Sequence, residues 1–184
     1  MESSVESMFR ASDRLYVDES KARGYFVVAT ASGVGPVSAS EKMLRSLLKP
    51  GQRRIHFKSE RDSRRREILA RMNELDVRVA VWVAKGLPDR EARPLCLTSL
   101  TQEAVRGRAA QLFIERDDSI MQIDRRLIAG VLRQNRSSEL QYRHVAPHEC
   151  PLLWVSDAVA WCYSSGGDWL RRTEQLVEAR VIRL

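Results

Sequence analysis

The sequence predicts a single α/β domain in which helices flank a mixed sheet. Its 184 residues and its hydrophobic content of 43% suit one domain built around one core. Short apolar runs with strand character alternate with longer segments whose apolar residues have helical spacing. The first two runs, at 15–18 and 24–31, are joined by a short hairpin-like connection, which predicts an antiparallel pair within the sheet.

The remaining strands are predicted from runs of apolar and β-branched residues. The run at 77–84 is nearly continuously apolar, as expected for a central strand covered on both faces. The run at 140–144 is more polar and indicates an outer strand, and 181–184 indicates an edge strand. In chain order the expected strands are 15–18, 24–31, 53–57, 77–84, 111–115, 140–144 and 181–184.

Helical spacing and capping residues predict the helices. Met43, Leu44 and Leu47 lie on one face of the first helix. Ser59 and Asp62 match a capping box, in which Ser59 caps the second helix and Asp62 reaches back to it. In chain order the expected helices are 38–48, 60–75, 89–106, 119–134, 152–163 and 168–176.

The ends of the chain and its apolar runs bear on location. We expect a flexible tail at 1–12 and the folded domain at 13–184. The first residues are acidic where a signal peptide needs basic residues, and the longest apolar runs are too short to cross a bilayer. These features predict a cytoplasmic protein with no membrane segment, and they leave the oligomeric state open.

The net charge and the cysteine content limit which classes of binding partner, disulfide framework and zinc site we expect. Thirty-one Lys and Arg against 24 Asp and Glu give a net charge of +7, which favours a polyanionic partner such as nucleic acid. The alternative is that the arginines form solvated helix faces. Cys96, Cys150 and Cys162 are odd in number and widely separated, so we expect buried apolar side chains, with no disulfide framework or zinc ribbon.

Acidic residues stand where folding does not require them. The first strand ends on Asp18 and Glu19, and the strand at 111–115 ends on Glu115. Carboxylates at strand ends can hold a divalent cation over a sheet. The alternative for Asp18 is that it begins a turn, and Glu19, which points to the opposite face, is expected to be a turn or surface acid.

Asp157 lies within an expected helix that is otherwise almost entirely apolar. An ionised carboxylate on such a buried face needs a metal ion, hydrogen bonds or an ion pair. The sequence leaves two interpretations equally open, a metal ligand and a buried ion pair with an arginine. Glu60 is a fourth candidate acid in the first turn of the second helix, where compensation of the helix dipole is the alternative.

Together, Asp18, Glu60, Glu115 and Asp157 can form a cluster that holds two divalent ions. Such ions activate water and stabilise the charge that develops at phosphorus during in-line displacement. Nearby basic residues would contact the phosphate backbone, and the candidates are Lys21, Arg53, Arg54 and Lys58.

The motifs resemble those of the bacterial family labelled domain of unknown function 3800. They are residues 16–20 on the first strand, His56 and Glu60 before a helix, Glu115 on a later strand, and 156–158 on a late helix. The resemblance spans about Arg14 to Trp169. It implies a ribonuclease H-like fold, similar to that of nucleases and integrases, with the motif acids as metal ligands.

The resemblance implies a role for each acid. Asp18 is the ligand on the first strand, Glu115 the acid on the later strand, and Asp157 the acid that completes the metal site, while Glu60 matches the helix acid. The chain departs from the family pattern at Lys21, where glycine is usual, and at Ser156, where alanine is usual.

Histidine and tryptophan residues offer weaker signals. His148 precedes the helix that carries Asp157 and is a candidate for proton transfer or phosphate contact, although an ordinary loop histidine is the alternative. Pro147 argues against a zinc site built on His144 and His148. Three tryptophans on or near the late helix suit a core and also suit stacking on bases: Trp154, Trp161 and Trp169.

The sequence therefore predicts a nuclease that depends on Mg²⁺ or Mn²⁺. The competing prediction is a non-catalytic module on the same fold that binds nucleic acid or takes part in protein assembly. Neither DNA nor RNA is favoured as the substrate.

Overall fold

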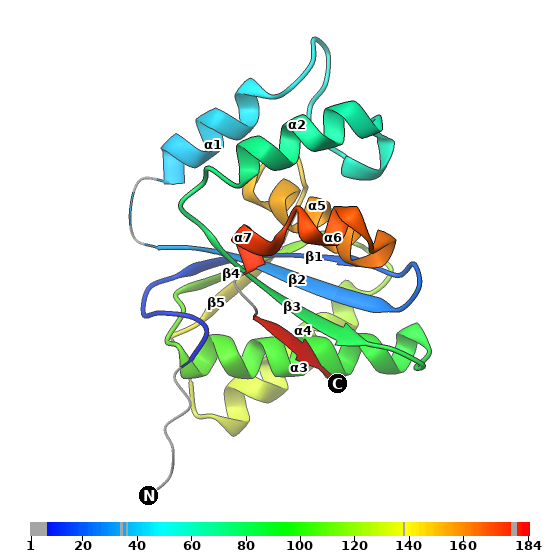
Figure 1. Cartoon of the computed structure of the whole chain (residues 1–184). Helices are drawn as coiled ribbons and strands as arrows, with labels where there is room; N and C mark the ends of the chain where they lie inside the picture. The colour runs from blue at the N-terminus through cyan, green and yellow to red at the C-terminus, as the bar shows by residue number, and fades with distance from the viewer. Residues whose placement is uncertain (1–6, 34, 36, 138, 178–179) are drawn as a thin grey trace, which may run out of the picture.

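The computed structural model describes residues 7–33, 35, 37–137, 139–177 and 180–184. Their strands form one mixed sheet with the order β5-β4-β1-β2-β3-β6 (Figure 1). β1 is antiparallel to β2 and parallel to β4, which confirms the predicted fold class. The strands are β1 Arg14–Ser20, β2 Tyr25–Ser32, β3 Arg78–Ala84, β4 Gln111–Glu115, β5 Gln141–Val145 and β6 Val181–Arg183.

Helices cover both faces of the sheet (Figure 1). One face carries α1, α2, α5, α6 and α7, and the other carries α3 and α4. The helices are α1 Val37–Ser46, α2 Asp62–Met72, α3 Asp89–Arg106, α4 Met121–Gln134, α5 Leu152–Ser165, α6 Asp168–Arg171 and α7 Glu174–Val177, with a 3₁₀ helix, η1, at Phe57–Ser59. None of the helices in the described part of the chain is long and apolar enough to cross a membrane.

The alternation of side chains along β1 divides the core between the two faces. Leu15 and Val17 pack with α3 and α4, whereas Tyr16 packs with α5. The same alternation directs Asp18 toward the α5 face and Glu19 toward the α3 face. The period of a strand therefore decides which layer each of the two acids meets.

Most predicted elements are confirmed within a few residues. α3 and β4 have the predicted bounds, and β5 and β6 are the two outer strands of the sheet. β3 is buried on both faces as predicted but lies next to the edge strand β6, so it is not central. The last predicted helix is divided into α6 and α7, and Gly167 occupies the position before α6.

Two local predictions between α1 and β3 are wrong. Residues 53–57 pair with none of the described strands, although Ile55 and Phe57 are both buried and His56 between them is not. Both side chains belong to the core on the α5 face, and the Phe57 ring contacts Trp161 of α5, so their alternation reflects burial and not strand pairing. The capping box is also absent, because α2 begins at Asp62 after Arg61, with no side chain capping its first turn.

The folded domain extends beyond the predicted start at residue 13. Residues 1–6 of the expected tail lie outside the described residues, but Phe9 is buried and its ring lies 6.1 Å from that of Trp82. Gly107 permits this packing, because a side chain there would meet the Phe9 carbonyl oxygen at 2.5 Å. The three cysteines are free; Cys96 and Cys162 are buried as predicted, whereas Cys150 is only half-buried.

Candidate active site: an acidic cleft

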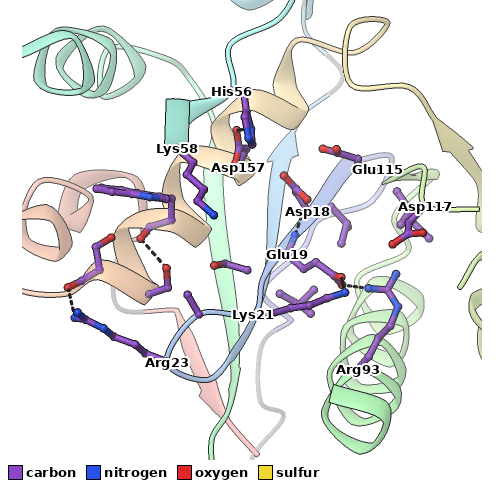
Figure 2. Close-up of a pocket in the computed structure, with 18 of the residues that line it drawn as sticks. Asp18, Glu19, Lys21, Arg23, His56, Lys58, Arg93, Glu115, Asp117 and Asp157 are labelled. Atoms are coloured by element: carbon purple, nitrogen blue, oxygen red, sulfur yellow. Dashed lines mark hydrogen bonds and ion pairs between the residues drawn. The ribbon is translucent and has the colours of Figure 1, made fainter. Parts of the chain in front are cut away.

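A cleft of about 1080 Å³ opens where β1 and β4 end beside α5. Asp18, Glu115 and Asp157 all line it, and Figure 2 shows their carboxylates directed toward the same space. We call this region the acidic cleft and these three residues the acid cluster. Three segments far apart in the sequence thus bring together three of the four predicted acids.

Strand pairing places two of the acids. β1 and β4 are parallel neighbours with Val17 opposite Ile114, so Asp18 and Glu115 follow at the same edge of the sheet. The Asp18 Oδ1 atom accepts a hydrogen bond of 2.7 Å from the Glu19 backbone N–H, which orients the carboxylate. The parallel pairing of β1 and β4 is therefore sufficient to place the Asp18 and Glu115 carboxylates at the same edge, and no loop is needed to position them.

The third acid is held by α5, which lies across β1 and β2. The Ser156 hydroxyl lies 2.7 Å from the Tyr16 carbonyl oxygen, to which it donates, and 2.7 Å from the Thr30 hydroxyl. These contacts join the helix to both strands one residue before Asp157. Ser156, where the family resemblance leads one to expect alanine, thus has a structural role.

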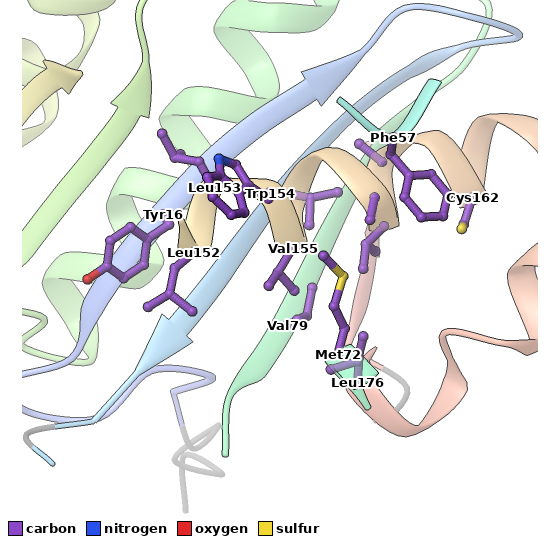
Figure 3. Close-up of a cluster of buried hydrophobic side chains, with 14 of the residues drawn as sticks. Tyr16, Phe57, Met72, Val79, Leu152, Leu153, Trp154, Val155, Cys162 and Leu176 are labelled. Carbon is purple, nitrogen blue, oxygen red and sulfur yellow. The ribbon is translucent and has the colours of Figure 1, made fainter. Parts of the chain in front are cut away.

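The apolar residues of α5 fix its remaining faces. Leu153, Trp154 and Val155 are buried against the sheet and the other helices (Figure 3). Asp157 lies on the cleft side, and its side chain is 18% exposed. The Phe57 backbone N–H donates to Asp157 Oδ2 at 2.9 Å, and His56 Nδ1 lies 3.5 Å from the same oxygen.

Asp157 therefore lacks the buried arginine partner that was one of its two interpretations. Among the described residues, no arginine nitrogen lies within 4.0 Å of its carboxylate. Hydrogen bonding to Asp157 raises the pKa of His56, and partial burial of the imidazole opposes this effect. The favourable neighbours of this carboxylate are a backbone amide and an ionisable imidazole.

The acid cluster is electrostatically unfavourable in the absence of a cation. Burial raises the pKa of Asp18 well above its usual value, and the charges of Glu115 and Asp157 raise it further. A hydrogen bond between the Asp18 and Glu115 carboxyl groups acts in the same direction. Arg54 opposes this effect in part, and its guanidinium lies 3.2 Å from Glu115.

The donor chemistry of the cluster suits a hard divalent cation, because carboxylate oxygens are the ligands that Mg²⁺ and Mn²⁺ prefer. The side chains are not gathered into a complete ligand set. In the described ranges, no three His, Cys, Asp or Glu side chains are close enough together to hold a metal ion. Asp18 accepts a hydrogen bond from the Glu19 backbone N–H, while Asp157 is turned toward Phe57 and His56.

Glu60 does not belong to this cluster, which corrects the prediction. It does not line the acidic cleft, and it follows η1 instead of lying in the first turn of α2. Lys49 Nζ lies 2.5 Å from one of its oxygens, and Gln52 donates to the other at 2.8 Å. Burial alone would raise the pKa of Glu60, but these two partners lower it.

The four predicted basic residues differ in how close they lie to the acidic cleft. Lys58 lines the acidic cleft and extends into it from η1, as Figure 2 shows. Lys21 also lines the cleft, where its ammonium lies 3.1 Å from Glu19. Arg54 lies beside Glu115, whereas Arg53 is exposed outside the residues that line the cleft.

The other predicted candidates lie mainly elsewhere. His148 is partly buried and does not line the acidic cleft. His144 is buried, with Nε2 3.0 Å from Asp124, so it belongs to a separate ion-pair network. Trp154 is a core residue whose indole N–H donates to the Pro147 carbonyl at 2.6 Å, while Trp161 and Trp169 line the cleft.

Sequence reasoning assigned no role to several residues of the cleft. In the sequence, His56 stands out only as part of the family motif, and no local pattern indicates a role for Arg65 or Arg93. Arg93 lies beneath β1, where it binds Glu19 and makes two hydrogen bonds to buried Asp124. Glu19 also accepts a hydrogen bond of 2.6 Å from the Tyr25 hydroxyl, so it is a half-buried, paired acid and not a simple surface residue.

Comparison with known proteins supports the fold. No family model matches the chain, and no curated protein matches it in sequence. A chain in the structure of the PCNA:RNase HII complex from Archaeoglobus fulgidus superposes with a TM-score of 0.56. The match covers 89% of this chain and 77% of that chain. The fold is ribonuclease H-like. At 14% sequence identity, the likeness extends to the fold alone.

Proposed function

We propose that the protein is a nuclease that depends on a divalent metal ion and hydrolyses phosphodiester bonds in the acidic cleft. One observation carries the proposal. Three carboxylates from β1, β4 and α5 face one cleft on a ribonuclease H-like fold, where burial raises the pKa of Asp18 and the charges of Glu115 and Asp157 raise it further. Membership in the domain of unknown function 3800 family remains part of this proposal and rests on the motif residues.

The acid cluster would hold the cation. Asp18 and Glu115 supply oxygens from the sheet, and Asp157 supplies a third carboxylate from the helix. A bound Mg²⁺ or Mn²⁺ would stabilise charge at phosphorus and make a water molecule more acidic. Binding would also relieve the repulsion within the cluster, because a cation favours the ionised form of each carboxyl group.

Residues around the cluster would bind and orient the substrate. The Phe57 N–H fixes the direction of the Asp157 carboxylate. The Lys58 ammonium has no carboxylate within 4.0 Å among the described residues, so it is free to contact a substrate phosphate. Lys21, by contrast, would have to exchange its contact with Glu19 for a phosphate.

Cleavage of labelled single-stranded, duplex and hybrid oligonucleotides with Mn²⁺ tests the proposal. We expect wild type to cut at least one of them and EDTA to stop the reaction. Asp18→Asn should lower the rate by at least about 100-fold, the order of effect for losing one charge-stabilising group in a catalytic site. Glu74→Gln, which changes an exposed acid paired with Arg71, is the matched control and should keep wild-type activity.

The second candidate is a non-catalytic module that binds nucleic acid. The raised pKa of buried Asp18 favours it, because a proton held on this carboxyl group can relieve the repulsion without a metal ion. Binding without cleavage, undiminished by EDTA and steeply weakened by salt, would support this module. Binding that is weak and insensitive to salt would indicate a protein-assembly role without nucleic acid.

A further inference from the structure

We propose that Arg65 is a positioning residue for the acidic cleft, which deepens and rests on the proposed function. Its guanidinium joins its own helix, α2, to the preceding turn at η1 and to α5, which is distant in the sequence. In this place it determines how the turn at 56–58 faces the acid cluster.

Arg65 fixes the backbone of η1 through two carbonyl oxygens. Its Nε atom donates to the Phe57 carbonyl at 3.0 Å, and one terminal nitrogen donates to the Lys58 carbonyl at 2.6 Å. The other terminal nitrogen donates to Asp62 at 2.7 Å, which holds the side chain against its own helix. A planar guanidinium can make these bonds together, whereas a lysine ammonium cannot reproduce their fork geometry.

Arg65 also joins this turn to the helix that carries Asp157. Its guanidinium carbon lies 4.2 Å from the centroid of the Trp161 ring, one turn along α5 from Asp157. The rings of Trp161 and Phe57 meet edge to face at 5.4 Å. The Arg65 side chain is only 13% exposed, so these contacts are partly shielded from water.

Two features of the acidic cleft depend on this turn. The Phe57 N–H is the backbone donor to Asp157, and the Lys58 side chain leaves the same turn and extends into the cleft (Figure 2). Because Arg65 binds the carbonyl groups of both residues, its loss should loosen the Asp157 carboxylate and the Lys58 ammonium together. Arg65 acts through these residues and need not touch the substrate.

The test compares Arg65→Lys with Arg66→Lys as the matched control. Arg66 is the next residue of α2, is exposed, and lies over Trp169 at 5.7 Å; among the described residues it makes no hydrogen bond to η1. The first readout is hydrogen exchange at the Phe57 amide, followed by NMR. We expect Arg65→Lys to speed this exchange by about tenfold, the factor equivalent to losing one or two net hydrogen bonds. Exchange in the strands β1 to β3 should stay unchanged.

The second readout is cleavage with Mn²⁺. Arg65→Lys should lower kcat and raise KM together, because both Asp157 and Lys58 lose their fixed positions, whereas Lys58→Ala should raise KM alone. Unchanged Phe57 exchange in Arg65→Lys, or an equal effect in Arg66→Lys, would overturn the assignment. If Arg65→Lys does not fold, Trp161→Phe, which reduces the ring surface under the guanidinium, should speed Phe57 exchange, and no change would again overturn it.

The two readouts separate this inference from the proposed function. Should wild type show no cleavage with Mn²⁺, the nuclease proposal fails, but Phe57 exchange still decides whether Arg65 holds the turn. Should wild type cleave while Arg65→Lys leaves both exchange and kinetics unchanged, the nuclease proposal stands and the role of Arg65 is rejected.

Discussion

Asp18 and Glu19 are neighbours on β1, but their carboxylates have opposite surroundings. Asp18 faces α5, where burial raises its pKa; the charges of Glu115 and Asp157 raise it further, and Arg54 opposes them in part. Glu19 faces α3 and meets Arg93, Lys21 and the Tyr25 hydroxyl. Carboxylates paired with cations stabilise a fold, whereas a group of carboxylates compensated only in part lowers its stability until a cation binds. The contrast separates structural acids from candidate catalytic ones.

The largest loss of stability is expected on the α3 face, where Arg93 pairs with Glu19 and Asp124. Arg93→Met removes the cation between Glu19 and buried Asp124, whose carboxylate it binds at 2.7 and 2.8 Å. Breaking a buried ion pair in this way should lower the free energy of unfolding by about 3–5 kcal/mol. Arg90→Met on the same helix, where the side chain is 85% exposed, is the control and should change it by less than about 0.5 kcal/mol. If urea unfolding shows equal losses of stability for Arg93→Met and Arg90→Met, the buried ion pair does not have the stabilising role assigned to it.

Glu60 is expected to behave like Glu19 and unlike Asp18. Its carboxylate is buried and bound by Lys49 and Gln52, so Glu60→Gln should lower the free energy of unfolding by about 1–3 kcal/mol. Urea unfolding at neutral pH measures the change. If Glu60→Gln instead raises the free energy of unfolding, the Glu60 carboxylate is destabilising in the fold, as we expect for Asp18.

Asp18→Asn should have the opposite sign when no divalent cation is present. The amide removes a charge that Glu115 and Asp157 repel, so we expect the Tm to rise by about 2–4 °C, the shift that 1 kcal/mol gives in a chain of this size. Glu19→Gln, at the next position on the strand, should lower the Tm. If Asp18→Asn also lowers the Tm, the Asp18 carboxylate stabilises the fold, and repulsion within the acid cluster is not the dominant effect.

The pH dependence should differ between the two kinds of acid. The raised pKa of Asp18 means that the folded state binds protons more tightly than the unfolded chain, so its destabilising effect is full above the folded pKa and disappears as pH falls. The advantage of Asp18→Asn should therefore shrink on acidification. The lowered pKa of Glu60 gives stability that is present above the unfolded pKa and lost as pH falls through the folded pKa. Thermal unfolding of wild type, Asp18→Asn and Glu60→Gln between neutral and acidic pH measures both trends.

Local periodicity explains which parts of the site were predictable. The strand period placed Asp18 and Glu19 on opposite faces, and apolar runs located the ends of β1 and β4 correctly. The partners of an acid depend on contacts between distant segments, so neither Lys49 beside Glu60 nor Arg93 beside Glu19 could be read from spacing. The contact of His56 with Asp157 likewise requires the turn at η1, which the sequence suggested was a strand.

The central claim is that Asp18, Glu115 and Asp157 form a cation site, and a thermal-shift titration with Mn²⁺ tests it most directly. Wild type should gain stability progressively with Mn²⁺, because the ion binds only the folded arrangement of the three carboxylates. Asp18→Asn should start from a higher Tm and respond much less, while Glu74→Gln should respond like wild type. The same Mn²⁺ response in wild type and Asp18→Asn would contradict the claim.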